Sequence, residues 1–355
     1  MKKVVLTTLV LVLGLFIITA QSVSETKEEA AYVSFTDSCG RTVEIPSSIT
    51  KVAPSGAVAT MYFATIAPEY MCNVNSAPDK EQMVYLPQQL AALPATGSLY
   101  GSKSTVNYEE LIKTGAQILV DIGDYKSSIK EDLDALQAQI GIPCIFIEGN
   151  LEHMAQAFRT LGSILEGKEE RGEALAAFTE KTVAMAKENS AKVKDEEKVR
   201  VLYTTGADGL GTNAKGSTQA QVLDLVGAEN AVVLEKVTNK GGGNVINAEQ
   251  LYNADPDLIV FSSDSIYDSV ANDSVWSNLR AVKEGKYYEI PDKPYNWLSG
   301  PPSINMLAGI WWLGNLVYPQ YYDYSVEEVI KEYYSLFWNY SLSQAEVENL
   351  LSRAR

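Results

Sequence analysis

Histidine is almost absent from this sequence of 355 residues, and its scarcity excludes several kinds of chemistry. His153 is the one histidine, so the chain has no HExxH motif, no three-histidine metal site and no pair of imidazoles for proton relay. The sequence also lacks the GxSxG motif of serine hydrolases and the GxxxxGK[ST] loop that binds phosphates. We therefore expect a protein that binds a ligand without converting it, with no catalytic residues.

Cysteine is also scarce, and its count limits the covalent cross-links. Cys39, Cys72 and Cys144 are odd in number, so at most one disulfide can form within the chain. Their spacing is too wide for a metal-binding knuckle, and no metal site is predicted. Cys144 lies in the apolar run IPCIFI, where an inert thiol in a buried strand is expected.

Basic residues are outnumbered, since 29 Lys and Arg stand against 45 Asp and Glu, for a formal charge of −16. This charge disfavours nucleic acids and anionic lipid surfaces as partners. It does not exclude an anionic ligand, because the local field of a pocket can oppose the net charge. The length and the 46% of hydrophobic residues are sufficient for two domain cores. We expect a monomer.

The first 20 residues resemble a targeting segment. Lys2 and Lys3 precede the uncharged apolar run of residues 4–20, as in a secretory signal peptide. A retained membrane anchor is the alternative, because a run of this length is at the short end of what spans a bilayer. Residues 21–31 are polar and charged, which suits a flexible spacer. We expect an exported protein, in the periplasm or at the outer face of the cytoplasmic membrane.

A long helix is predicted over residues 169–194. Apolar or small residues recur there at steps of three and four: Leu175, Phe178, Thr182, Met185, Asn189 and Val193. No proline or glycine follows Gly172 within the segment. We predict that this helix joins an N-terminal lobe (residues 32–168) to a C-terminal lobe (residues 195–355). The alternative is an ordinary surface helix within one domain.

Strands and helices alternate on both sides of that helix. Residues 116–123 and 142–149 in the first half, and 198–206 and 257–265 in the second, are apolar runs typical of strands buried on both faces. Residues 300–319 are predicted as a helix that opens with Pro301 and Pro302. The fold class is therefore α/β, with two Rossmann-like lobes built on parallel sheets and joined by one long helix.

Aromatic residues follow several of the predicted strands. Because ligands of open α/β sheets bind beyond the carboxyl ends of the strands, we expect a groove lined by Tyr125, Tyr203, Tyr267 and Trp297. The alternative is that a chain with 20 tyrosines carries them everywhere. Asp121 and Asp124 also lie at a strand end, where acidic residues are common and prove nothing.

Five segments, in this order, resemble those of one protein family. They are FTDSCGRTVEIP (35–46), NYEELIKTGAQILVDIG (107–123), LGTNAKGSTQAQVLDLVGAEN (210–230), NAEQLYNADPDLIVF (247–261) and WLSGPPSINMLAGIWWLGNLVYPQYY (297–322). Together they resemble the class III (helical-backbone) substrate-binding proteins of ABC importers, in the iron-complex branch, from about Phe35 to Leu350. The resemblance implies the two-lobed fold and a ligand held between the lobes. It adds Ser55, Tyr100 and Lys215 as walls of the predicted site.

The branches of that family bind different ligands, and the sequence favours some of these ligands over others. A single histidine disfavours the zinc and manganese binders, and Gly243 stands where the vitamin B12 binder has a tryptophan. No arginine falls in the predicted ligand loops, whose candidate cations are Lys103, Lys126, Lys215 and Lys240. We expect an iron complex, either a ferric siderophore or a haem-like ligand, and no other cofactor. Molybdate or tungstate is the second choice and cobalamin is disfavoured, while an exported enzyme or a surface sensor is less favoured still.

The resemblance also implies a membrane partner, the permease of an ABC importer with its ATPase. In this family one glutamate of each lobe docks on basic residues of the permease. Glu109 follows Asn107-Tyr108, and Glu249 follows Asn247-Ala248, in the matching contexts. The alternative is that both are acids at helix N-termini, which the helix dipole stabilises by about 0.3–1 kcal/mol.

Overall fold

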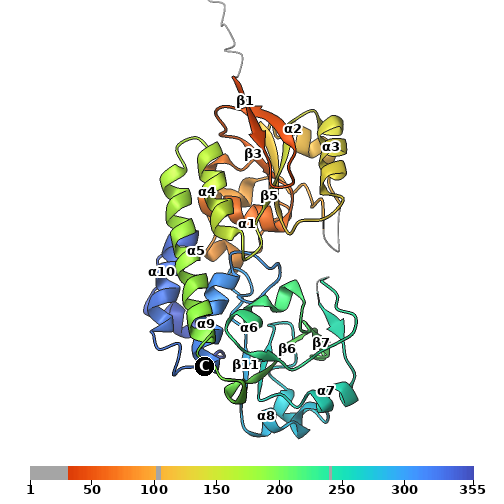
Figure 1. Cartoon of the computed structure of the whole chain (residues 1–355), viewed down its shortest axis with the longest axis vertical. Helices are drawn as coiled ribbons and strands as arrows, with labels where there is room; N and C mark the ends of the chain where they lie inside the picture. Colours follow the sequence, from red (N-terminus) through yellow and green to blue (C-terminus); the bar gives the residue numbers. More distant parts are fainter. Residues whose placement is uncertain (1–30, 101–104, 240–241) are drawn as a thin grey trace, which may run out of the picture. The chain divides into compact units, whose positions relative to one another are not determined.

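Strands alternate with helices over much of the computed structural model, which describes residues 31–100, 105–239 and 242–355 (Figure 1). Residues 31–355 group into one unit by their contacts. The predicted signal peptide (1–20), most of the predicted spacer (21–31), Lys103 and Lys240 lie outside the described residues. In the described part of the chain, no helix has the length and apolar character needed to cross a membrane.

The described chain opens with an antiparallel hairpin of β1 (Tyr32–Thr36) and β2 (Thr42–Pro46). Gly40, with φ of 77°, supplies the left-handed conformation that the turn requires. Arg41 fixes the hairpin to the sheet beside it. Its guanidinium donates to the Asp37 carboxylate (3.2 Å) and to the Cys144 backbone oxygen (3.0 Å).

The first sheet is parallel, in the order β3 (Val52–Pro54), β4 (Ile118–Gly123) and β5 (Cys144–Glu148). Its strands lie where the apolar runs predict them and are almost wholly buried. The Ile129, Leu133 and Leu136 side chains of α3 (Ile129–Ile140) pack on one face of the sheet. Helices α1 (Ala57–Ile66) and α4 (Met154–Ile164) cover the other face, and α2 (Tyr108–Lys113) precedes β4.

Cys144 is fully buried at the start of β5, where burial raises the pKa of its thiol to about 12, in agreement with the expected inert thiol. Cys39, Cys72 and Cys144 are all unpaired in the structure.

Helix α5 spans Glu169–Ser190, four residues less than the predicted segment, and packs against α4. The two helices approach closely at a pair of glycines. A Cβ on Gly172 would lie 2.6 Å from the Phe158 backbone oxygen and 3.0 Å from the Gly162 Cα. Small residues at this crossing allow the backbones to meet.

The second sheet has the order β11-β10-β6-β7-β9, with β8 also paired to β6. Strands β6 (Arg200–Thr205), β8 (Glu229–Asn230), β10 (Leu258–Phe261) and β11 (Tyr287–Glu289) are parallel. Strands β7 (Gly211–Thr212) and β9 (Asn244–Val245) are antiparallel, so the expected all-parallel sheet is wrong at this edge. The chain doubles back after β6 through Gly206 and Gly209, both at positive φ, instead of crossing over by a helix. The remaining helices of this half are α6 (Gln221–Leu225), α7 (Ala248–Ala254) and α8 (Arg280–Lys283).

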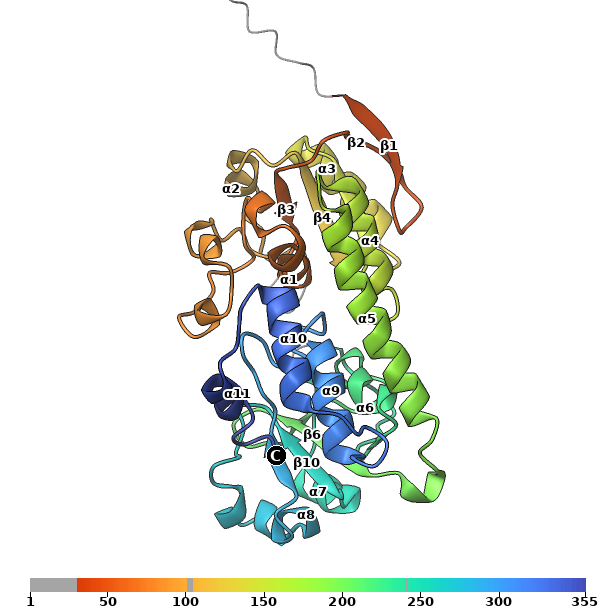
Figure 2. The same ribbon diagram turned by 90° about the vertical axis from the view of Figure 1, so that its left-hand side faces the viewer.

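The C-terminal helices are α9 (Met306–Val317), α10 (Val326–Trp338) and α11 (Gln344–Leu350). Helix α9 starts four residues after Pro302, so the predicted start at Pro301 is wrong, because residues 303–305 form turns that cap it. Helix α10 reaches α1 (Figure 2). Its Phe337 ring lies 6.0 Å from that of Phe158 and 5.4 Å from that of Phe178. One hydrophobic cluster therefore includes residues of both sheets.

Candidate functional site

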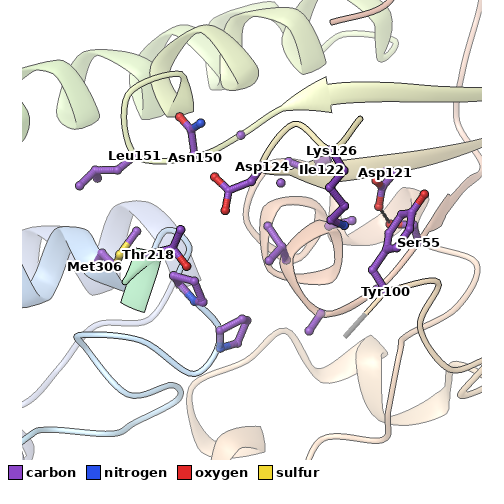
Figure 3. A pocket seen from close by; sticks show the side chains of 18 of the residues that line it. Ser55, Tyr100, Asp121, Ile122, Asp124, Lys126, Asn150, Leu151, Thr218 and Met306 are labelled. Carbon is purple, nitrogen blue, oxygen red and sulfur yellow. Dashed lines mark hydrogen bonds between the residues drawn. The ribbon is translucent and has the colours of Figure 1, made fainter. Parts of the chain in front are cut away.

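A cavity of about 320 Å³ lies where the carboxyl ends of β3, β4 and β5 meet the starts of α6 and α9 (Figure 3). The first half of the chain lines it with residues 55–59, Tyr100, residues 121–124, Lys126 and residues 149–151. The second half contributes Thr218, Gln221, Pro301, Pro302 and Met306. The strand-end rule therefore places the cavity at the correct edge of the first sheet.

The start of α1 forms one wall of this cavity. Helix α1 follows β3 after only Ser55 and Gly56, and no side chain caps it. The first backbone N–H groups of a helix have no acceptor within the helix. Here they belong to Ala57, Val58 and Ala59, which all line the cavity. These donors, together with the positive end of the helix dipole, favour a ligand oxygen that carries negative charge.

Ser55 and Asp121 form a buried hydrogen-bonded pair beside these donors. Each residue is only 5% exposed. The Ser55 hydroxyl donates to Asp121 Oδ1, as the dashed line in Figure 3 shows. The backbone fixes Ser55, because its N–H donates to the Val120 oxygen (3.1 Å) and its own oxygen accepts from Leu99 (2.9 Å).

Tyr100 and Lys126 form the adjoining wall. The Lys126 ammonium lies 3.4 Å from the centroid of the Tyr100 ring, an attractive cation–π contact. The Tyr100 hydroxyl donates to Asp132 Oδ2 (2.8 Å), which also accepts from the Ser128 hydroxyl (2.9 Å). The tyrosine ring is therefore held in place by groups outside the cavity.

Burial shifts the titration of both charged groups of these walls. It raises the pKa of the Asp121 carboxyl, against the hydrogen bond from Ser55 and the nearby Lys126 ammonium. It lowers the pKa of Lys126, against the charges of Asp121, Asp124 and Asp132. Among the described lining residues the charged side chains are Asp121, Asp124 and Lys126, and no arginine is present. The cavity thus offers acceptors as well as donors.

The opposite wall is largely apolar. Pro301 and Pro302 lie in the segment that leads into α9, and Met306 is its first residue. Thr218 lies in the 3₁₀ turn before α6, and Gln221 is the first residue of α6. Figure 3 labels Thr218 and Met306 on this wall. The charged side chains of the cavity therefore all come from the first half of the chain.

Of the predicted site residues, Ser55 and Tyr100 line the cavity. Tyr203 and Trp297 lie instead in the core, where each of these two side chains is 1% exposed. The Tyr203 hydroxyl is 2.7 Å from Ser299 Oγ, and burial raises its pKa to about 12. The Trp297 indole N–H donates to the Lys293 oxygen (3.3 Å). Both aromatic side chains fill the protein interior, because their polar atoms find partners there.

Tyr125, Lys215 and Tyr267 are also placed away from the cavity. Tyr125 is 53% exposed. Lys215 lies beside a separate hollow that Asp224 also lines. Tyr267 packs between the Tyr287 ring (5.6 Å between centroids) and the Arg353 guanidinium (5.2 Å). The structure does not bring these three together with Ser55 and Tyr100.

Asp121 and the donors of α1 are parts of the cavity that the sequence does not single out. Acidic residues are common at strand ends, so the position of Asp121 alone does not identify it as functional. The feature that could identify Asp121 is that it is a charged residue inside the otherwise apolar run of a fully buried strand. Charged residues are rarely buried without a partner or a function. Lys126 was named only as a candidate cation. No sequence pattern predicts that a helix without a side-chain cap will begin at a cavity.

Glu109 and Glu249 are both exposed, near the starts of α2 and α7. The caps of these helices are asparagines. Asn107 accepts from the Glu110 N–H (3.1 Å), and Asn247 from the Gln250 N–H (2.8 Å). Within the described residues neither glutamate makes an ion pair closer than 4 Å. Their role as docking residues stays a prediction.

Comparison with known proteins decides the family. The sequence model described as "Periplasmic binding protein" matches residues 73–294. This chain belongs to that family. As in the sequence-based expectation, the family consists of solute binders and not of enzymes. The binding protein described here shows no group of three or more His, Cys, Asp or Glu residues that could hold a metal ion, within the described residues.

Two curated relatives and one solved structure illustrate the family. This binding protein is 26% identical over 193 residues to the molybdate-binding protein MolA of Haemophilus influenzae, covering 53% of this chain and 52% of MolA. It is 23% identical over 192 residues to the Fe(3+)-citrate-binding protein YfmC of Bacillus subtilis, covering 53% and 58%. The alignments thus span about half the length of these relatives. An ABC transporter solute binding protein from Sulfurospirillum deleyianum superposes with a TM-score of 0.81 at 26% identity, covering 90% and 99% of the two chains.

Proposed function

We propose that this protein captures a solute outside the cytoplasm and delivers it to the permease of an ABC importer. Its membership of the periplasmic binding protein family supports this role. The exposed Glu109 and Glu249, without ion-pair partners among the described residues, are available for a basic docking surface. The cavity at the carboxyl edge of the first sheet, closed by the segments that lead into α6 and α9, is the place for the solute.

The ligand we propose is a compact iron complex of a small hydroxy acid, of the ferric citrate type. The observation that carries it is the polar wall, where the donors of α1 and Lys126 stand beside the acceptors Ser55 and Asp121. A ferric hydroxy-acid complex presents carboxylate oxygens, and iron-bound water supplies its O–H groups because Fe³⁺ binds the hydroxy group in its deprotonated form. The cavity of about 320 Å³ is at the lower end of the roughly 300–1,000 Å³ of small-molecule sites, which disfavours haem and cobalamin. The relative YfmC is named for Fe(3+)-citrate binding.

Molybdate or tungstate is the second candidate. The uncapped start of α1 supports it, since helix N-termini are suitable sites for compact oxyanions. The relative MolA is named for molybdate binding. The buried carboxylate of Asp121 opposes it, because a tetrahedral dianion brings charge of the same sign and no hydrogen to donate.

Calorimetric titration of the purified protein tests the proposal, with ferric citrate, citrate alone, molybdate, haem and cobalamin as separate ligands. We expect ferric citrate to bind most tightly. Lys126→Met should weaken it, whereas Lys130→Met, an exposed lysine of α3 that does not line the cavity, should leave it unchanged. A protein that binds haem or cobalamin more tightly than ferric citrate would refute this assignment.

A further inference from the structure

The hydrogen bond between Ser55 and Asp121 determines which polar atoms remain for a ligand. An ionised carboxylate only accepts hydrogen bonds, so the Ser55 hydroxyl must donate its one hydrogen to Asp121 Oδ1. Ser55 then has lone pairs but no hydrogen to offer. A serine at a helix start, which would otherwise donate to an anion, acts here as an acceptor.

The second carboxylate oxygen of Asp121 has no hydrogen-bond partner among the described residues. Asp121 is 5% exposed, and it lines the cavity. A carboxylate of a residue that is so little exposed is stabilised when a further hydrogen-bond donor binds it. The nearby cation, Lys126, lies over the Tyr100 ring instead. Within the described residues no second donor to Asp121 is present, so a bound ligand or a water molecule can supply one.

We infer that Asp121, backed by Ser55, is a specificity residue that selects ligands carrying their own O–H or N–H donor. This inference rests on the proposed function, since it concerns the same cavity. The α1 donors and Lys126 hold the negatively charged oxygens of the ligand, and Asp121 accepts from a hydroxyl or an iron-bound water. A fully deprotonated oxyanion fills the first role but meets repulsion in the second.

According to this inference, the two candidate ligand classes differ in whether the ligand carries a hydrogen that it can donate to Asp121. Molybdate and sulfate at neutral pH carry no hydrogen, whereas hydrogenphosphate carries one and a ferric hydroxy-acid complex carries O–H groups on its iron-bound water. Hydrogenphosphate and sulfate are nearly the same size and shape. Their comparison therefore isolates the donor from the bulk and the geometry of the ligand.

The test compares the full chain with Asp121→Asn and Asp124→Asn by calorimetric titration of ferric citrate, molybdate, hydrogenphosphate and sulfate. In Asp121→Asn the amide can turn its NH₂ group to the ligand. Ferric citrate should then bind at least about tenfold more weakly, the loss expected for a hydrogen bond to a charged group. Molybdate and sulfate should gain by a similar factor. Asp124→Asn makes the same change in charge at an exposed position of the same cavity, and should strengthen the binding of all four anionic ligands by a similar factor, without a switch of preference between them.

The outcomes are distinguishable. Absence of ferric citrate binding to the unsubstituted protein overturns the proposed ligand, and the preference for hydrogenphosphate over sulfate then decides the inference. Equal shifts in the two aspartate variants would show a general effect of charge and overturn the inference alone. The inference would also be overturned if sulfate bound as tightly as hydrogenphosphate, or if no oxyanion bound at all. If Asp121→Asn fails to fold by circular dichroism, Asp121→Ala removes the acceptor without adding a donor, and should abolish the discrimination.

Discussion

Tyr203 lies within a predicted strand and Trp297 follows β11, yet both side chains point into the core, where their polar atoms bond to the Ser299 hydroxyl and the Lys293 oxygen. The strand-end rule identifies the edge of the sheet at which ligands bind but does not fix the direction of each side chain. That direction depends on packing between segments far apart in sequence. Ser55 lines the cavity because it follows directly after a strand and before a helix, where little conformational freedom remains.

Trp297→Ala is therefore expected to act on stability. Removal of a fully buried tryptophan leaves a cavity and should lower the free energy of unfolding by about 3–5 kcal/mol. Urea denaturation followed by circular dichroism measures it. Tyr125→Ala, at a side chain that is 53% exposed, should change it by less than about 0.5 kcal/mol. If the Trp297→Ala protein were as stable as the original but bound ferric citrate more weakly, Trp297 would belong to the ligand site after all.

At the scale of elements, α5 was predictable because its apolar spacing continues over six turns without a proline. Strands β7 and β9 were not, since two-residue strands are too short to show a period. Helix α5 is held to α4 by charge as well as by close packing. The Arg159 guanidinium donates to Glu173 (2.8 and 2.9 Å) and to Glu180 (2.9 Å).

This pairing predicts a pH-dependent contribution to stability. The hydrogen bonds from Arg159 lower the pKa of both Glu173 and Glu180. A carboxyl whose pKa is lower in the folded state stabilises the fold above its unfolded pKa of about 4.3, and the contribution is lost as pH falls through the folded value. Arg159→Gln should thus lower the melting temperature at pH 7 and match the original protein in strong acid. Lys187→Gln, at a lysine without an ion pair among the described residues, should show no such difference. A gap in melting temperature that persists in strong acid would assign the Arg159 effect to packing.

At the scale of the whole molecule, the hydrophobic cluster shared by both sheets limits relative motion. Helix α5 contains no proline and no glycine after Gly172, and α10 adds a second connection through Phe337. We expect little closure on binding. Solution scattering curves with and without ferric citrate should superimpose. A marked decrease in the radius of gyration would contradict this and indicate a hinge.

The docking prediction also belongs to this scale. Glu109→Ala with Glu249→Ala should leave ferric citrate affinity and the melting temperature unchanged, because asparagines supply the helix caps. Uptake by the reconstituted importer should fall, more for the double variant than for either single one, and association should weaken as salt rises. Glu131→Ala, an exposed acid of α3, serves as the control. Normal uptake by the double variant would refute the docking role.

The position of α10 has a consequence for how the chain matures. Tyr333 and Phe337 complete the packing around Phe158 and Phe178, although they come more than 150 residues later. Domains that fold during synthesis do so as their residues emerge, from the N-terminus onward. Here the first sheet lacks part of its core until nearly the whole chain has left the ribosome. The polypeptide should thus stay loosely folded and accessible to chaperones during synthesis, and acquire protease resistance only once α10 has joined it.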